Sequence, residues 1–210
     1  NENMKKIFAL ILAMVLCIGL LAACGSNGND AKTDNTAAKN VKLGFIFLHD
    51  KNSTYDLNFI KAADAACEKL GITGAQKLYK TNVPEGQEAL TAAEDLADKG
   101  CNIIFADSFG HEPYIIEAAK KYPNVQFCHS TGTRAHTEGL ANYHNAFASI
   151  YEGRYLAGIV AGLKLNEMIE AGEFTAEEAK MGYVGAFTYA EVQSGYTSFY
   201  LGAKSVCPTV

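Results

Sequence analysis

Apolar residues in this chain gather in short runs, and between the runs they recur at three- and four-residue steps. Residues 41–48 are nearly all apolar, which is typical of a strand covered on both faces. Residues 55–70 follow with helical periodicity, and Gly71 is a C-terminal stop signal. By the same criteria we expect strands at 75–79, 101–106, 125–128, 140–144 and 181–186, and helices at 84–99, 113–122, 149–165 and 192–204.

Strands and helices alternate along the chain, so the sequence predicts an α/β fold with a parallel, doubly wound sheet. Pro84 is expected in the first turn of its helix, where proline is tolerated. The alternation changes at helix 149–165, because one strand–helix pair follows it and a single strand cannot bury a sheet face. We therefore expect a first lobe over residues 41–148 and the start of a second lobe over 149–210, which this chain leaves incomplete.

The N-terminus carries basic residues, then an apolar run, then small residues, which is the order of a secretory signal. Lys5 and Lys6 precede the uncharged run 7–23. At about 17 residues the run is marginal for spanning a hydrocarbon core roughly 30 Å thick. A short membrane anchor helix is the alternative, but no basic stop-transfer cluster follows the run.

Residues 21–24 read Leu-Ala-Ala-Cys, which resembles the bacterial lipobox. The resemblance implies a signal peptide over residues 1–23 and acyl chains, palmitate among them, on Cys24. Residues 24–40 would then be the lipidated cysteine and a flexible tether, because they are polar and lack periodic apolar positions. Two or more acyl chains anchor a protein stably. We therefore expect the protein to be lipid-anchored at the extracytoplasmic face of the cell membrane.

Composition narrows the range of partners. With 49% hydrophobic and 20% charged residues the chain can build a core, and a net charge of -5 without a basic patch argues against nucleic acid. Of the six cysteines, Cys17 lies in the signal and Cys24 at the lipid site. The others have no C-x-x-C spacing for zinc, and the sequence leaves their pairing open. They are Cys67, Cys101, Cys128 and Cys207.

Polar and aromatic side chains follow the ends of the predicted strands. Parallel sheets bind ligands beyond the carboxyl ends of their strands, so the loops that begin there should converge at one edge. These loops mix aromatic rings with hydroxyl and amide groups, which suits a small planar polar ligand. They are residues 49–56, 107–112, 129–133 and 187–189.

Several loop residues also have structural interpretations. Asn52 and Ser53 could cap the first helix, because Asn and Ser are favoured at the N-cap. Gly110 could make a turn. His49 and His111 are more simply explained as loop hydrogen-bonding groups than as metal ligands, since no metal-binding spacing supports them. The sequence therefore predicts no metal site and no cofactor.

An enzyme is not favoured by the sequence. Ser53, Ser108 and Ser130 are candidate nucleophiles, but none lies in G-x-S-x-G and no triad order stands out. The loop after the first strand lacks the glycine-rich motifs that hold nucleotide phosphates. Asp50 and Asp56, six residues apart across a turn, are a weak signal for paired catalytic carboxylates.

Three motifs resemble one known family. They are Phe-Ala-Asp-Ser-Phe-Gly at 105–110, Tyr-Glu-Gly-Arg-Tyr-Leu-Ala-Gly at 151–158 and Gly-Tyr-Val-Gly-Ala-Phe at 182–187. Together with the lipobox they resemble the basic membrane protein (BMP) family of ABC-transporter substrate-binding lipoproteins, which includes purine nucleoside receptors. The resemblance covers about 41–210. It implies a periplasmic-binding-protein type I fold, with two Rossmann-like lobes closing over a ligand, and an ABC permease and ATPase as partners.

The resemblance also implies ligand contacts. Family members hold the base between two aromatic rings, and Tyr55 and Phe187 match these positions. Polar contacts would come from the first loop, and the turn after the third strand would line the cleft. The implied ligand-binding residues are Asp50, Asn52, Tyr55, Asp56, Ser108, Phe109, Gly110 and Phe187.

The ligand expected from this resemblance is a purine nucleoside or a related small heteroaromatic. Three alternatives stay open from the sequence. One is a sugar or autoinducer on the same fold, and another is a sensor that signals to a membrane kinase. The last is an α/β hydrolase, which would need a suitably placed His and acid.

Overall fold

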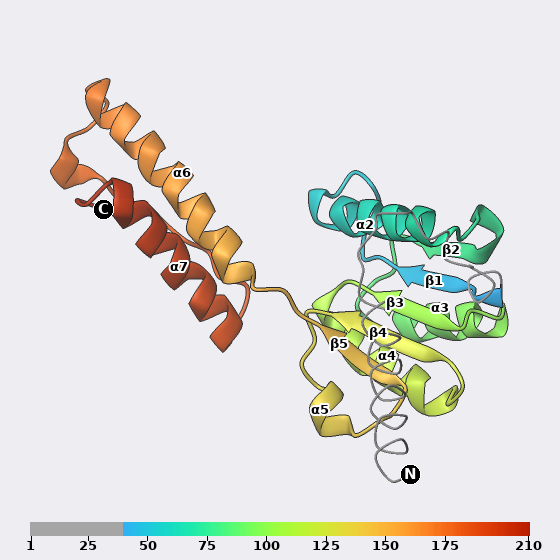
Figure 1. Ribbon diagram of the computed structural model, residues 1–210. Coiled ribbons are helices and arrows are strands. Elements are labelled where there is room, and N and C mark those ends of the chain that lie inside the picture. Colours follow the sequence, from blue (N-terminus) through green and yellow to red (C-terminus); the bar gives the residue numbers. More distant parts are fainter. Residues whose placement is uncertain (1–39) are drawn as a thin grey trace, which may run out of the picture. The chain divides into compact units, whose positions relative to one another are not determined.

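The computed structural model describes residues 40–210, and in this part five short strands form one sheet with only parallel pairings (Figure 1). The strand order is β2-β1-β3-β4-β5. The strands are β1 (Leu43–Ile46), β2 (Lys77–Lys80), β3 (Ile103–Ala106), β4 (Gln126–Ser130) and β5 (Tyr143–Ala146). The parallel α/β fold expected from the sequence is confirmed. The expected signal peptide, Cys24 and nearly all of the tether lie outside the described residues.

Helices connect and follow the strands. Figure 1 shows α2 on one side of the sheet and α3 and α4 on the other. The α-helices are α2 (Thr54–Leu70), α3 (Gln87–Asp98), α4 (Glu112–Lys121), α5 (Ala135–Glu138), α6 (Ile150–Glu170) and α7 (Ala190–Val206). Short 3-10 turns are η3 (Gly74–Gln76), η4 (Phe109–His111) and η5 (Ala176–Glu178).

The main core lies between the sheet and the α3–α4 layer. Ile104 and Phe127 of the central strands are fully buried there against Leu96 of α3 and Ile115 of α4. Burying a side chain of this size contributes about 1.5–3 kcal/mol. This core fixes the strands, and therefore the positions from which the loops at their carboxyl ends start.

The ends of α2 follow local sequence signals. The Ser53 hydroxyl accepts a hydrogen bond from the Asp56 backbone N–H, so Ser53 is the N-cap. Gly71 ends the helix with a φ of 69°, a left-handed conformation that favours glycine. The capping interpretation is confirmed for Ser53, and the cap sets where the first pocket loop meets its helix.

Pro84 lies outside α3, which corrects the prediction that it belongs to the helix. The helix begins at Gln87, after the N-cap Gly86. The preceding Val83 donates its N–H to the Phe47 carbonyl at 3.1 Å and is buried. These contacts hold the chain against the end of the sheet, so it turns into the helix only after Pro84.

The strand predicted at 181–186 is also wrong. Residues 181–185 carry no regular secondary structure, and within residues 40–210 no strand pairs with them. A strand exists only with a hydrogen-bonded neighbour, so an apolar run alone does not make one. The segment instead leads into α7.

The helices α6 and α7 pack so closely that the backbone of one contacts the backbone of the other. A Cβ on Gly158 would overlap the Phe199 carbonyl oxygen, and one on Gly202 would overlap the Tyr155 carbonyl oxygen. Gly158 therefore packs closely against α7, whereas Gly153 has open space beside it. The two helices form a tight pair.

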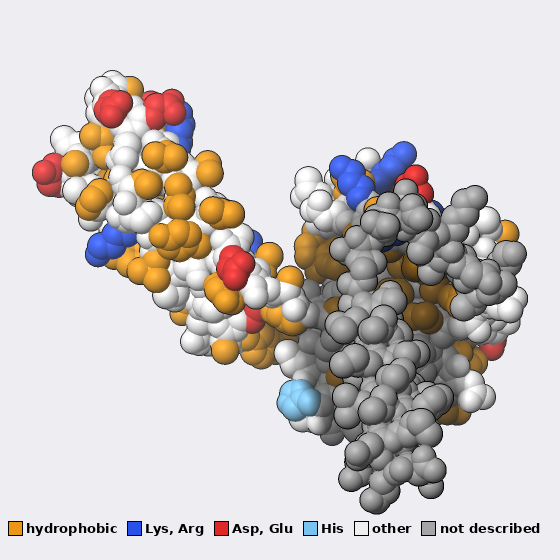
Figure 2. Space-filling view, viewed as in Figure 1, with side chains coloured by type: hydrophobic (Ala, Val, Ile, Leu, Met, Phe, Trp, Pro, Cys, Tyr) orange, Lys and Arg blue, Asp and Glu red, His pale blue; other side chains and the backbone are white. Residues whose placement is uncertain are grey.

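Large apolar side chains are exposed on this helix pair. Figure 2 shows hydrophobic side chains gathered over α6 and α7 on the face in view. Leu156 and Val160 are 63% and 67% exposed. Among the described helices, none is both long and apolar enough to cross a membrane.

Candidate ligand-binding site

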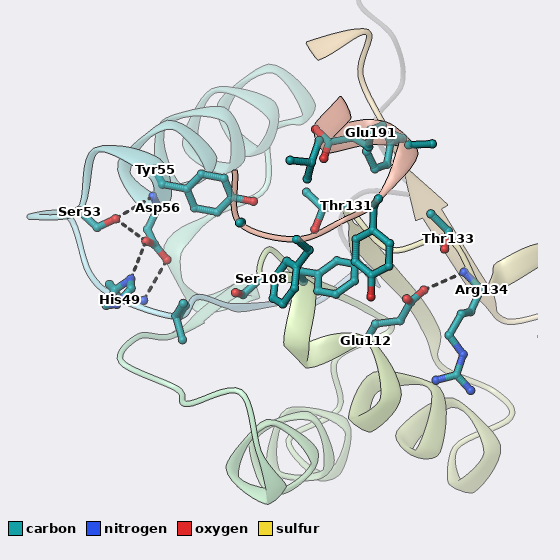
Figure 3. Close-up of a pocket in the computed structure, with 18 residues that line it drawn as sticks. His49, Ser53, Tyr55, Asp56, Ser108, Glu112, Thr131, Thr133, Arg134 and Glu191 are labelled. Atoms are coloured by element: carbon teal, nitrogen blue, oxygen red, sulfur yellow. Dashed lines mark hydrogen bonds and ion pairs between the residues drawn. The ribbon is translucent and has the colours of Figure 1, made fainter. Parts of the chain in front are cut away.

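A cavity of about 740 Å³ opens at the carboxyl ends of the strands (Figure 3). Its walls come from the loops after β1, β3, β4 and β5 and from residues 186–192 at the start of α7. Pockets for small molecules measure about 300–1,000 Å³. The cavity therefore has a suitable size, and it lies where α/β sheets bind ligands.

Aromatic rings form much of the wall. Phe109 lies with its ring centroid 5.5 Å from those of both Phe187 and Tyr189, and the latter two are 5.7 Å apart. Tyr55 and Phe147 also line the cavity. These rings provide apolar faces on which a flat ligand can stack.

Tyr55 is held by its hydroxyl group, which donates a hydrogen bond to the Asp107 carbonyl at 2.8 Å. Its ring packs against Phe59, with centroids 5.0 Å apart. Burial, with the negative charges of Asp107 and Asp56, raises the pKa of Tyr55 to about 12. The side chain is therefore a neutral phenol whose ring orientation is fixed.

Asp56 is fully buried at the start of α2 and is bonded to the loop before it. Its carboxylate accepts hydrogen bonds from the Ser53 hydroxyl at 2.5 Å and from the His49 backbone N–H at 2.9 Å. The His49 ring donates a further bond at 3.2 Å. Burial opposes ionisation, but these bonds outweigh it and hold the pKa of Asp56 below its usual value. Asp56 therefore shapes the loop, and His49 is a hydrogen-bonding group there.

Asp107 lies beneath Tyr55 and is 2% exposed. Its Oδ1 accepts a hydrogen bond from the Leu48 backbone N–H at 3.2 Å, while its Oδ2 has no partner among the described residues. Burial, followed by the charge of Asp56, raises the pKa of Asp107 to about 7. One carboxyl group of this buried pair therefore stays protonated below neutral pH.

The turn after β3 is fixed from two sides. Glu85 accepts hydrogen bonds from the Ser108 hydroxyl at 2.5 Å and from the Gly110 N–H at 2.7 Å. The His129 ring accepts the Gly132 N–H at Nδ1, so its Nε2 carries the proton and donates to the Ser108 carbonyl at 2.6 Å. Burial lowers the pKa of His129 and keeps the ring neutral. These bonds set the position of Phe109 in the wall.

Thr131 has an unusual backbone for a β-branched residue. Its φ is 74°, in the left-handed region that such residues rarely adopt. Its hydroxyl oxygen is buried and has no partner within residues 40–210, although the residue lines the cavity. Strain of this kind is concentrated at functional sites.

The cavity brings together five of the eight implied ligand residues: Tyr55, Asp56, Ser108, Phe109 and Phe187. The other three lie outside the lining. Asp50 accepts the Asn52 N–H at 2.9 Å within the first loop, and Gly110 contacts Glu85. Ligand contacts by all eight remain predictions.

Other lining residues were not selected from the sequence. They include Glu112, Thr131, Thr133, Arg134, Phe147, Tyr189 and Glu191. Several of them follow predicted strand ends, and this position is the sequence signal that could indicate them. Which of these residues face the cavity depends on turns that the sequence pattern does not define. Among the described residues no group of three or more His, Cys, Asp or Glu could hold a metal ion, and the four described cysteines are free.

Residues 45–210 match the family described as Bmp, ABC transporter substrate-binding protein PnrA-like. This chain belongs to the Bmp family. The match spans the sheet, the cavity loops and the α6–α7 pair. The family resemblance in the sequence motifs is thereby confirmed, and Bmp proteins are substrate-binding components of ABC transporters.

The names of two curated relatives point to different ligands. A purine-binding protein from Brucella abortus is 33% identical over 175 residues, covering 82% of this chain and 45% of its own length. A Haloferax volcanii protein, whose name points to glucose, is 34% identical over 115 residues, covering 55% of this chain and 26% of its own. This chain spans less than half the length of these relatives.

A solved structure supports the fold. An ABC transporter solute-binding protein from Conexibacter woesei aligns with a TM-score of 0.56 at 18% identity. The alignment covers 81% of this chain and 52% of that one. At this identity the similarity concerns the fold alone, and it agrees with the parallel α/β sheet described above.

Proposed function

We propose that this Bmp protein captures a purine nucleoside, or a related small heteroaromatic, outside the cytoplasm and delivers it to an ABC permease. The observation that carries the proposal is the cavity at the strand ends, with its wall of aromatic rings. The Brucella abortus relative, named as purine-binding, supports the same ligand class.

Stacking would supply much of the affinity. Tyr55 and Phe187 line the same cavity from α2 and from the segment before α7. Phe109 and Tyr189 extend the apolar surface beside Phe187. A base stacked on an aromatic side chain gains about 1–3 kcal/mol. Hydrogen bonds to the edge of the ring would then select among flat ligands.

The lipid anchor is part of the same proposal. Acyl chains on Cys24 and a tether of residues 24–40 would keep the binding domain near the membrane, where a permease and its ATPase accept the ligand. The protein would act by binding and release rather than by catalysis. Its family of transport proteins supports this role.

A sugar is the second candidate ligand. The name of the Haloferax volcanii relative favours it, and aromatic rings can also stack on the apolar face of a sugar. The carboxylates and hydroxyl groups around the cavity could bind sugar hydroxyls.

Calorimetric titration of the full-length protein separates the two candidates. Adenosine, guanosine, inosine and glucose are each titrated under the same conditions. Saturable heat with a nucleoside and none with glucose is the expected result. Binding of glucose with no heat from any nucleoside would replace the purine proposal by the sugar one.

A further inference from the structure

Glu112 is a buried carboxylate in the wall of the cavity, and neither the family match nor the sequence motifs give it a role. It is the first residue of α4 and only 4% exposed. A carboxylate in such a position needs hydrogen bonds or a cation, because removing a charge from water is costly. The hydrogen bonds to its two carboxylate oxygens therefore show whether one oxygen is left for a ligand.

One oxygen of Glu112 is fully used. Oε1 accepts hydrogen bonds from the Arg134 backbone N–H at 2.9 Å and from the Tyr143 hydroxyl at 2.9 Å. The Asn145 amide adds a longer bond of 3.3 Å. Gly132 packs directly on this carboxylate, where a Cβ would overlap Oε1. The carboxylate is thus held in one orientation by neutral groups from two other segments, the loop after β4 and strand β5.

The second oxygen, Oε2, accepts no hydrogen bond from any described residue. Oε2 is not one of the buried polar atoms that lack a partner, and Glu112 lines the cavity. Figure 3 shows the bond between Glu112 and Arg134 on the side of the cavity opposite Ser53 and His49.

No side-chain cation pairs with Glu112 in residues 40–210. The Arg134 guanidinium bonds to Glu138 instead, and Lys120 bonds to the same Glu138 at 2.9 Å. The neighbouring His129 is neutral, since burial lowers its pKa. The negative charge at the cavity wall is therefore available to a group on the ligand.

We infer that Glu112 is a ligand-binding residue that determines specificity. Its Oε2 accepts a hydrogen bond from an N–H group on the edge of the ligand's stacked ring. This inference rests on the proposed function and makes its ligand class narrower. An oriented anionic acceptor favours heteroaromatic rings that carry an amino or ring N–H donor. It disfavours rings that present only acceptors, because two facing acceptors leave the buried charge unpaired.

The test compares nucleosides with and without N–H donors on the base. Adenosine, inosine and guanosine carry such donors, whereas purine riboside has the same ring system and sugar but none. The full-length protein should bind at least one donor nucleoside about 10-fold or more tightly than purine riboside, as expected for a hydrogen bond to a charged group.

The Glu112→Gln variant should abolish this preference. The amide oxygen can keep the bonds of Oε1, while the amide nitrogen replaces the acceptor that faces the cavity. The affinity ratio of donor nucleoside to purine riboside should fall to within about threefold, with purine riboside itself nearly unaffected. Glu117→Gln is the matched control, because Glu117 lies on the same helix, is half-exposed and pairs only with Lys121 among the described residues. It should keep the wild-type preference.

Two results overturn different statements. No heat from the wild-type protein with any nucleoside would overturn the proposed function, and this inference with it. Nucleoside binding with an unchanged preference in Glu112→Gln would overturn the inference alone. Should that variant not fold, equal wild-type affinities for purine riboside and the donor nucleosides would still overturn it.

Discussion

At the scale of single residues, the cavity separates groups that shape the protein from groups left free for a ligand. Asp56, Glu85 and His129 form hydrogen bonds to neighbouring loops. Tyr55 and Glu112 line the cavity, and Oε2 of Glu112 accepts no hydrogen bond from the described residues. Specificity should therefore depend on the free groups, and rigidity on the bonded ones.

Tyr55→Ala should weaken nucleoside binding by about 1–3 kcal/mol, because it removes one stacking surface. Tyr55→Phe, which keeps the ring but loses the bond to the Asp107 carbonyl, should cost less. Calorimetry on both variants measures the difference. An affinity unchanged in Tyr55→Ala would limit Tyr55 to packing against Phe59.

Asp107 should make stability depend on pH. Its pKa rises from 3.8 to about 7 on folding, so the folded state keeps a proton that the unfolded chain loses over that range. The free energy of unfolding therefore falls as pH rises from about 4 to 7. Asp107→Asn should remove a pH-dependent contribution on the order of 4 kcal/mol.

The measurement is the difference in unfolding free energy between wild type and Asp107→Asn at several pH values from about 3.5 to about 8, a range that covers the titration of Asp107 in both states. The comparison is needed because His111 and His129, whose pKa values are lowered by burial, change stability in the opposite direction. Parallel curves for the two proteins would contradict the prediction.

At the scale of elements, the tight contact of α6 and α7 depends on glycine. Gly158→Ala should destabilise the protein by about 1–3 kcal/mol, because the new methyl group meets the Phe199 backbone. Gly153→Ala on the same helix should instead stabilise it by about 0.5–1 kcal/mol, since the space there is open and alanine favours a helix. Urea unfolding distinguishes the two, and equal effects would argue against close packing.

The elements that form the lobe were largely predictable from the sequence. Nearly continuous apolar runs marked β1 and β3, and Gly71 marked the end of α2. The predictions are wrong where contacts between residues far apart in the sequence determine the local structure. The Val83 N–H donates a hydrogen bond to the Phe47 carbonyl, so α3 begins later in the sequence than predicted. Residues 181–185 have no neighbouring strand in the described part of the chain.

The candidate site was predictable in part. The family resemblance points to Tyr55 and Phe187, and the strand ends point to loops that line the cavity. The sequence does not point to Glu112 as a site residue. Its proposed role depends on the hydrogen bond from the Arg134 N–H to Oε1 and on an Oε2 without a partner among the described residues. Neither can be inferred from residue type or spacing.

At the scale of the whole molecule, the proposed lipid anchor should determine where the protein resides. Cys24→Ser should release the protein from the membrane fraction, because it removes the thiol that we propose to be acylated. Cys17→Ser, within the same predicted signal peptide, should leave it membrane-bound. Labelled palmitate incorporation and sedimentation of membranes measure both variants, and retention of Cys24→Ser in the membrane would contradict the anchor.

The glycine contacts between α6 and α7 also have a mechanical consequence. With backbone against backbone at Gly158 and Gly202, no layer of side chains is available to yield, so the helices cannot slide past each other without breaking contact. Phe187 and Tyr189 lie directly before α7. We therefore expect a displacement that a ligand imposes on these rings to move α6 and α7 together as one rigid unit.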